Sequence, residues 1–195
     1  MIPRRTKAFF KLKDLKSRTK IVRGGTSAGK TIGILCLLIH YAGTNENKEI
    51  SVVAESIPHL RRGALKDFIN ILKGLNRFYE SSFNRSTLKY TFDTGSYIEF
   101  FSTDQPDKLR GARRTDLYIN EANNVPFDAY QQLSIRTSNC IWLDYNPTSL
   151  FWADKELINE PDTDFLTLTY KDNESLPESI VKEIEKAKEK AKTSS

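Results

Sequence analysis

The chain has 195 residues, of which 38% are hydrophobic and 28% charged, and its net charge is +5. These values are typical of one soluble globular domain and argue against a disordered chain or a membrane protein, because the longest apolar run, residues 32–42, has about half the length of a bilayer span. Cys36 and Cys140 have neither CxxC spacing nor a secretion signal before them, so we expect a reducing interior, core thiols and no zinc site.

The chain begins with a basic arm, residues 1–18. Residues 1–23 contain nine Lys or Arg against one acidic residue, Asp14, which leaves the remainder slightly acidic. Such an arm can contact nucleic-acid phosphates, but a charged terminus is as often simply solvated. The sequence leaves both interpretations open.

A phosphate-binding loop is the strongest motif. Two glycines separated by four residues and followed by Lys and Thr fit the P-loop pattern, between a buried strand that ends at 20–22 and a helix over 31–43. Glycines let backbone N–H groups turn toward phosphate oxygens, and the helix N-terminus adds partial positive charge. The alternative is a Gly/Ser-rich turn between two core elements. The expected phosphate-binding residues are Gly24, Gly25, Thr26, Ser27, Ala28, Gly29, Lys30 and Thr31.

Strands and helices alternate through the rest of the chain. We expect strands over 49–54, 116–120, 140–144 and 164–170, helices over 56–75, 127–135 and from 177 onward, an antiparallel hairpin of 87–92 with 97–102, and a charged loop over 103–114. Connections of βαβ length predict an α/β fold with a mainly parallel sheet flanked by helices. Ligands then gather at the carboxyl ends of the strands.

Hydrolysis of a nucleoside triphosphate needs a cation site. Lys30 is expected to reach the β- and γ-phosphates, and the Thr31 hydroxyl to bind Mg²⁺. The strand over 116–120 ends in Asn120-Glu121, where the usual motif has Asp followed by Glu. Asn120 can accept a hydrogen bond from a metal-bound water but brings no charge, so we propose Asp144 as an additional carboxylate for binding Mg²⁺. The alternative is that Asp144 caps the turn before Asn146-Pro147.

Hydrolysis also needs a residue that positions water and a positive charge for the transition state. Glu121, at a strand end beside the loop, is the candidate for the residue that positions the attacking water. The alternative is an ordinary surface Glu. Arg110, on a movable loop, is the candidate arginine finger. Arg23 is a weaker phosphate-binding candidate; it, Arg113 and Arg114 could also be solvated or contact nucleic-acid phosphates.

Three of these segments together resemble the ATPase part of the large terminases of tailed phages: residues 23–31, the 109–113 loop running into 118–122, and 144–147. Residues 169–173, followed by a helix, are similar to the segment that closes the ATPase region in that family. The resemblance covers residues from about 20 to about 190.

The resemblance implies a P-loop NTPase of the additional-strand catalytic-glutamate (RecA-like) type with an added β-hairpin. It implies a motor that uses ATP and Mg²⁺ to drive double-stranded DNA into a procapsid, as a ring on the portal protein, with a small terminase subunit, in the host cytoplasm and away from membranes. Arg110 would act across the subunit boundary, and Asn146 would couple the state of the γ-phosphate to movement.

Two departures from the family pattern stand out. The expected single ATPase domain fills 1–195, with a terminal helix and tail over 177–195, and leaves no room for the family's nuclease domain. Asn120 replaces the usual Asp. Two other functions therefore stay open: another DNA-dependent P-loop motor such as a helicase, and a non-hydrolysing nucleotide-binding assembly subunit.

Overall fold

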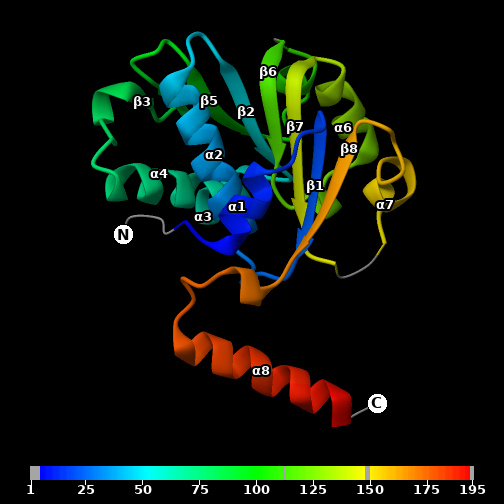
Figure 1. Ribbon diagram of the computed structural model, residues 1–195. Coiled ribbons are helices and arrows are strands. Elements are labelled where there is room, and N and C mark those ends of the chain that lie inside the picture. The colour runs from blue at the N-terminus through cyan, green and yellow to red at the C-terminus, as the bar shows by residue number, and fades with distance from the viewer. Residues whose placement is uncertain (1–4, 112, 148–149, 194–195) are drawn as a thin grey trace.

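A computed structural model describes residues 5–111, 113–147 and 150–193, and its centre is one eight-stranded sheet. The strands are arranged in the order β3-β4-β5-β2-β6-β7-β1-β8 (Figure 1). Their bounds are β1 Thr19–Gly24, β2 Glu49–Ala54, β3 Phe83–Asn84, β4 Lys89–Thr91, β5 Tyr97–Ser102, β6 Arg114–Ile119, β7 Thr137–Tyr145 and β8 Thr163–Leu168.

The sheet is parallel from β5 to β8, and only the short strands β3 and β4 run antiparallel at its edge. β7 lies between β1 and β6, so it separates the strand that enters the predicted phosphate loop from the strand that leads to Glu121. Because parallel strands end at the same edge, the segments that follow β1, β6 and β7 meet there.

Helices cover both faces of the sheet (Figure 1). α1, α2 and α4 contribute to one apolar cluster and α6 and α7 to the other. The helices are α1 Lys7–Lys13, α2 Lys30–Thr44, α3 Ile57–Arg62, α4 Ala64–Gly74, α5 Pro106–Leu109, α6 Phe127–Ser134, α7 Trp152–Glu156 and α8 Glu178–Thr193, with 3-10 turns η1 Glu80–Ser82, η2 Ala122–Asn124 and η3 Tyr170–Asp172.

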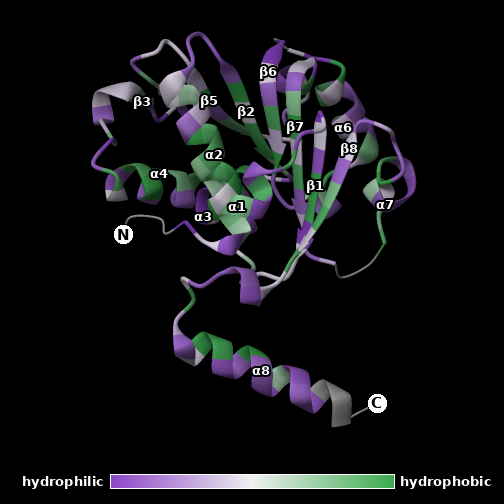
Figure 2. Ribbon diagram, in the orientation of Figure 1, coloured by the Kyte–Doolittle hydropathy of each residue, from purple (hydrophilic) through white to green (hydrophobic). Residues whose placement is uncertain are grey.

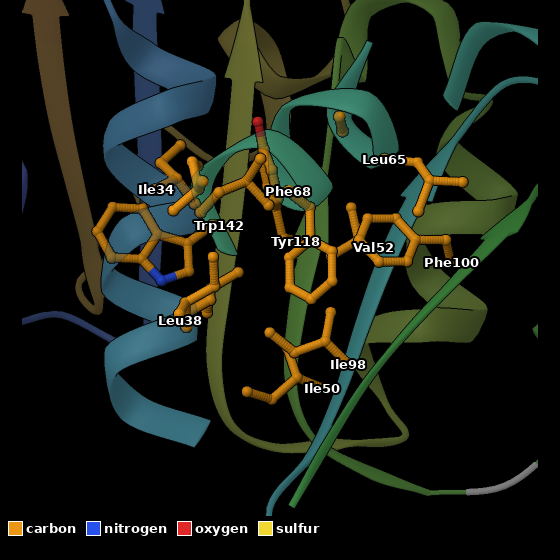
Figure 3. Close-up of a cluster of buried hydrophobic side chains, with 14 of the residues drawn as sticks. Ile34, Leu38, Ile50, Val52, Leu65, Phe68, Ile98, Phe100, Tyr118 and Trp142 are labelled. Atoms are coloured by element: carbon orange, nitrogen blue, oxygen red, sulfur yellow. The ribbon is translucent and has the colours of Figure 1, made fainter. Parts of the chain in front are cut away.

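The core between α2, α4 and the sheet is built from branched aliphatic and aromatic side chains (Figure 3). Phe68 of α4 packs against Phe100 of β5 with ring centroids 5.1 Å apart. Tyr118 of β6 is completely buried in the same cluster although it carries a hydroxyl. A buried hydroxyl needs a hydrogen-bond partner, and its partner lies in the candidate site.

Most of the predicted elements are confirmed. The strands over 49–54 and 97–102 have the predicted bounds, and β4 pairs antiparallel with β5 as the hairpin prediction required. The prediction of a single helix over 56–75 is wrong, because α3 ends and α4 begins at Gly63. Glycine is a poor helix residue, and its backbone here is not helical (φ −107°, ψ −111°).

The basic arm is partly a folded element, which the charge pattern did not indicate. Residues 7–13 form α1, whose Ala8 and Leu12 are fully buried. Leu12 packs so closely on α2 that a Cβ on Gly33 would lie 2.4 Å from its Cδ1. Lys11 forms an ion pair of 2.7 Å with Asp172. The first four residues of the arm, 1–4, precede α1 and lie outside the described residues.

Two further corrections concern loops and the C-terminal helix. The stretch over 103–114 contains α5, and Arg114 begins β6 instead of closing a loop. α7 was not predicted. α8 extends away from the sheet and shows hydrophobic residues among hydrophilic ones (Figures 1 and 2). Among the described helices, none combines the length and the apolar character that crossing a bilayer requires. Cys36 and Cys140 are free cysteines that are partly buried and pack against the core cluster.

Candidate nucleotide-binding site

The loop between β1 and α2 has the geometry that a phosphate cradle requires. Gly24 ends β1 beside β8, where a Cβ would lie 2.2 Å from the carbonyl oxygen of Leu168. Gly29 has φ +79°, a left-handed conformation that favours glycine. The first bond of α2 runs from Gly33 N to Gly29 O, so the amides before Gly33 have no acceptor within the helix. These amides form an N-terminus suited to an anion.

Lys30 lies at the centre of this loop. Its ammonium donates to the carbonyl oxygens of Gly24 at 2.6 Å and Gly25 at 3.1 Å, and to Oδ1 of Asn146 at 2.9 Å. The side chain is buried, and this burial lowers the pKa of Lys30, while the nearby Asp144 and Glu121 carboxylates oppose the shift. The loop therefore curls around a cation that faces both Asn146 and the acidic residues.

Asp144 at the end of β7 is the centre of a buried polar cluster. One of its oxygens, Oδ1, accepts hydrogen bonds from Tyr118 Oη at 2.9 Å, Asn120 Nδ2 at 2.9 Å and the backbone N–H of Glu121 at 3.1 Å. The other oxygen, Oδ2, lies 3.4 Å from the Thr31 hydroxyl. Asp144 thus joins the end of β6 to the first turn of α2, and its side chain makes no hydrogen bond to the described residues of the turn that follows, Asn146 and Pro147.

Glu121 is held in an unusual position. It adopts a left-handed backbone with φ 53°, which is uncommon for a residue other than glycine. Its Oε2 lies 3.2 Å from Nε2 of His59 and accepts from Asn124 Nδ2 at 3.3 Å. The side chain is 37% exposed, so it is neither buried in the core nor free in solvent. The break at Gly63, four residues after His59, leaves α3 short beside this carboxylate.

The arginines that the sequence singled out lie in different surroundings. Arg23 turns toward β8, where its guanidinium lies 5.0 Å from the Phe165 ring centroid. Arg114 is buried and donates to Ser51 Oγ at 3.0 Å, so its interpretation as a solvated or nucleic-acid-binding residue is wrong. Arg110 follows α5, is exposed, and makes no hydrogen bond or ion pair with the other described residues. Ala112 of the same segment lies outside them.

Three contributors to the site were not predicted from the sequence. Tyr118 binds Asp144, His59 faces Glu121, and Asn173 Nδ2 donates to the Ser27 carbonyl of the loop at 3.0 Å. Asn173 belongs to the stretch over 169–173 that the family resemblance singled out, which is a signal that could have identified it. Tyr118 likewise lies in the stretch over 118–122 that the resemblance singled out, although no role was assigned to it. His59 carries no local signal, because it meets Glu121 only through the fold.

The comparison with known families decides the assignment. The sequence pattern of the family described as phage terminase large subunit matches residues 16–194. The chain belongs to this family. The family prediction made from the three segments is thereby confirmed. No curated protein sequence matches the chain.

Solved terminases share the fold of this terminase chain. The large terminase of a thermophilic bacteriophage superimposes with a TM-score of 0.76 at 21% identity, over 92% of this chain and 49% of that one. The same phage protein in complex with ATP-gamma-S gives a TM-score of 0.74 at 22% identity, over 92% and 48%. The ATPase domain of the Thermus phage P74-26 large terminase gives 0.64 at 15% identity, over 85% and 80%.

These likenesses establish the predicted fold class for this terminase. The chain has the RecA-like P-loop architecture, with a mainly parallel sheet flanked by helices and an added hairpin. The additional strand of that class is β7, between β1 and β6. The chain spans about half the length of the thermophilic bacteriophage terminase chains that it matches.

Proposed function

We propose that this chain binds ATP with Mg²⁺ and hydrolyses it to move double-stranded DNA into a procapsid. The observation that carries the proposal is the position of Lys30, which lies inside a glycine loop and faces Asn146 and the acidic ends of β6 and β7. Membership of the phage terminase large subunit family supports it. So does the large terminase of the thermophilic bacteriophage, which was solved with ATP-gamma-S.

Within this proposal the loop holds the triphosphate tail. Amides of residues 24–31 bind phosphate oxygens, and Lys30 exchanges its contacts with the Gly24 and Gly25 carbonyls for the β- and γ-phosphates. Asn146, already bonded to Lys30, senses the γ-phosphate and couples its state to movement. Arg23, at the end of β1 directly before the loop, contributes through its charge.

The residues at the loop fit Mg²⁺. Thr31 Oγ1 and Asp144 Oδ2, 3.4 Å apart, are the hard oxygen donors that this cation prefers, and Asn120 lies beside them. Within the described part of the chain, no cluster of three or more His, Cys, Asp or Glu could hold a metal, and in this proposal phosphate oxygens and water complete the site. When bound, the cation neutralises charge on the β- and γ-phosphates.

Glu121 positions the attacking water in this proposal. His59 and Asn124 hold its carboxylate, and rotation of the side chain away from them brings it toward the γ-phosphate. Arg110 stabilises the transition state at the site of a neighbouring subunit, which agrees with its exposure and its lack of bonding partners among the described residues.

The proposed partners follow from the family. They are double-stranded DNA, the portal protein, a small terminase subunit and further copies of this chain in a ring on the procapsid, within the cytoplasm of the infected bacterium. Residues 1–195 act as a single ATPase domain in this proposal. The whole motor requires these partners, whereas ATP binding requires only the site described above.

ATP turnover with Mg²⁺ tests the proposal. Lys30→Ala should abolish both nucleotide binding and turnover, and Glu121→Gln should abolish turnover while it leaves binding largely intact. Lys66→Ala, on the exposed side of α4, is the matched control and should behave as wild type. Binding without turnover in the wild type, at any protein concentration, would instead favour the non-hydrolysing assembly subunit that Asn120 suggests.

A second comparison separates the packaging motor from other DNA motors. ATP turnover should rise with double-stranded DNA and rise further when portal protein is added. Turnover that responds to DNA but not to portal protein would favour a helicase-like motor. Turnover that responds to neither would contradict any DNA motor.

A further inference from the structure

The carboxylate expected at the end of β6 is found at the end of β7. Residue 120 is an Asn, and its Nδ2 donates to Asp144 Oδ1 at 2.9 Å. The two residues are 3% and 1% exposed, so water cannot screen either group. Since a carboxylate only accepts hydrogen bonds, the amide nitrogen of Asn120 must be the atom that faces it.

The two oxygens of Asp144 have different surroundings. Oδ1 receives three donors, from Tyr118, Asn120 and the backbone of Glu121, and these use its bonding capacity. Oδ2 has only the long 3.4 Å contact with the Thr31 hydroxyl among the described residues. The oxygen with spare capacity is therefore the one that faces the phosphate loop.

We propose that the role of the usual motif's Asp, which is expected at position 120, is taken by Asp144 on the neighbouring strand, and that position 120 has become the neutral partner of this carboxylate. Asp144 supplies the anionic ligand for the cation through Oδ2, and Asn120 is the neutral donor that orients Asp144. This inference rests on the proposed ATP and Mg²⁺ binding. It makes the amide of Asn120 a requirement of the site, so restoring the usual Asp at this position should damage it.

The reason lies in the chemistry of the pair. An Asp at position 120 would place a second carboxylate oxygen about where Nδ2 now lies, 2.9 Å from Asp144 Oδ1, with no proton between them. Two buried carboxylates at that distance repel each other strongly. Asp144 would turn away from this contact, and Oδ2 would leave its position beside Thr31.

Tyr118 is a positioning residue in the same arrangement. Its ring is anchored in the core beside Val52 and Phe68 (Figure 3), and its hydroxyl both donates to Asp144 and accepts from Asn120 Nδ2 at 3.2 Å. Three residues thus form a closed triangle in which only Asp144 carries charge. The rigid core fixes the direction of the phenol, and the phenol fixes the rotamer of Asp144.

Exchange of the two residues tests the inference. Four proteins are compared: wild type, Asn120→Asp, Asp144→Asn, and the double variant that carries both substitutions. The first readout is the Tm of each protein without nucleotide or metal. The second is the affinity for Mn²⁺, used in place of Mg²⁺, measured by electron paramagnetic resonance with ADP present. ADP affinity without metal is measured separately.

Asn120→Asp should lower the Tm by about 5 °C or more and weaken Mn²⁺ binding about tenfold or more. Asp144→Asn should also weaken Mn²⁺ binding at least about tenfold. The double variant should recover most of both values, because it again has one carboxylate opposite one amide. Tyr118→Phe should weaken Mn²⁺ binding about tenfold with ADP affinity unchanged, which a purely structural role would not produce.

A second Asn–Asp pair on the same two strands provides the control. Asn139 Nδ2 of β7 donates to Asp116 Oδ1 of β6 at 2.8 Å, at the opposite end of the strands from the loop. Asn139→Asp should also lower the Tm, but it should leave Mn²⁺ binding with ADP unchanged.

The outcomes distinguish the proposed roles of Asn120 and Asp144 from the proposed binding of nucleotide. If Asn120→Asp binds Mn²⁺ as tightly as wild type at an unchanged Tm, or if the double variant recovers neither value, this assignment of roles is wrong while the proposed function stands. If wild type binds no ADP with or without Mn²⁺, the proposed function is wrong and the inference falls with it.

Discussion

The ammonium of Lys30 donates to the side-chain oxygen of Asn146 at 2.9 Å, and this bond joins the first residue of α2 to the segment that follows β7. The two residues are 116 positions apart in the chain. The same ammonium is bonded to two carbonyls of the loop, so it can exchange these carbonyls for phosphate oxygens while it stays bonded to Asn146. Occupancy of the loop is thereby linked to the end of β7.

Asn146→Ala should reduce the ability of the site to distinguish ATP from ADP. The amide of Asn146 can accept from Lys30 and donate to a terminal phosphate, whereas a methyl group can do neither. We expect the ratio of ADP to ATP-gamma-S dissociation constants to fall about tenfold, which corresponds to about 1.4 kcal/mol. Titration with fluorescent nucleotides measures this ratio.

Asn146→Asp is the companion variant. A carboxylate beside Lys30 should compete with phosphate and repel it, so both nucleotides should bind more weakly than they bind to Asn146→Ala. Equal ratios in wild type and Asn146→Ala would contradict the role of Asn146 as a sensor of the γ-phosphate.

Gly24→Ala should destabilise the fold. The added Cβ would lie 2.2 Å from the Leu168 carbonyl oxygen, and parallel pairing fixes that backbone in place. Overpacking of this kind costs about 1–3 kcal/mol or more. Gly43→Ala is the control, because a Cβ there has nothing within 4 Å and Ala favours the helix. Thermal unfolding should show a lower Tm for the first variant only.

Asn173→Ala should loosen the phosphate loop from the C-terminal side. The hydrogen bond from Asn173 Nδ2 to the Ser27 carbonyl, 3.0 Å long, holds the middle of the loop. Its loss should weaken ATP binding several-fold, since a net hydrogen bond contributes about 1 kcal/mol, with little change in Tm. Calorimetric titration measures the affinity. An affinity equal to that of wild type would show that the loop is rigid without Asn173.

Much of this architecture could be predicted from local patterns. β2 and β5 follow from runs of β-branched and aromatic residues, and the loop 24–31 follows from its glycine spacing. The break at Gly63 was missed because the apolar spacing continues in phase through it. α1 was missed because its charges concealed the two buried residues, Ala8 and Leu12.

The site was predictable only where it is contiguous in the chain. The loop and Glu121 are marked by their own neighbours, and Asp144 could be proposed because it ends a strand. His59 could not be found in this way, and the role of Tyr118 could not be assigned, because their roles depend on contacts with residues 62 and 26 positions away. Long-range pairing of this kind has no period and no spacing that a sequence displays.

Mixing two inactive proteins tests the proposed action of Arg110 between subunits. Arg110→Ala and Glu121→Gln should each lose most turnover, but a mixture should recover part of it, because some interfaces then combine an intact Glu121 with an intact Arg110. The wild-type rate per subunit should also rise with protein concentration. A mixture that stays inactive at every ratio would contradict action in trans.

Insertion of β7 between β1 and β6 fixes a distance that no single side chain could set. Neighbouring strands lie about 4.8 Å apart, so the strand entering the lysine loop and the strand leading to Glu121 are separated by about 10 Å. β7 thus works as a spacer whose thickness leaves space for a phosphoryl group and a cation between lysine and glutamate. Any change that thins or bulges this strand alters the clearance between them, even when every side chain at its rim is retained.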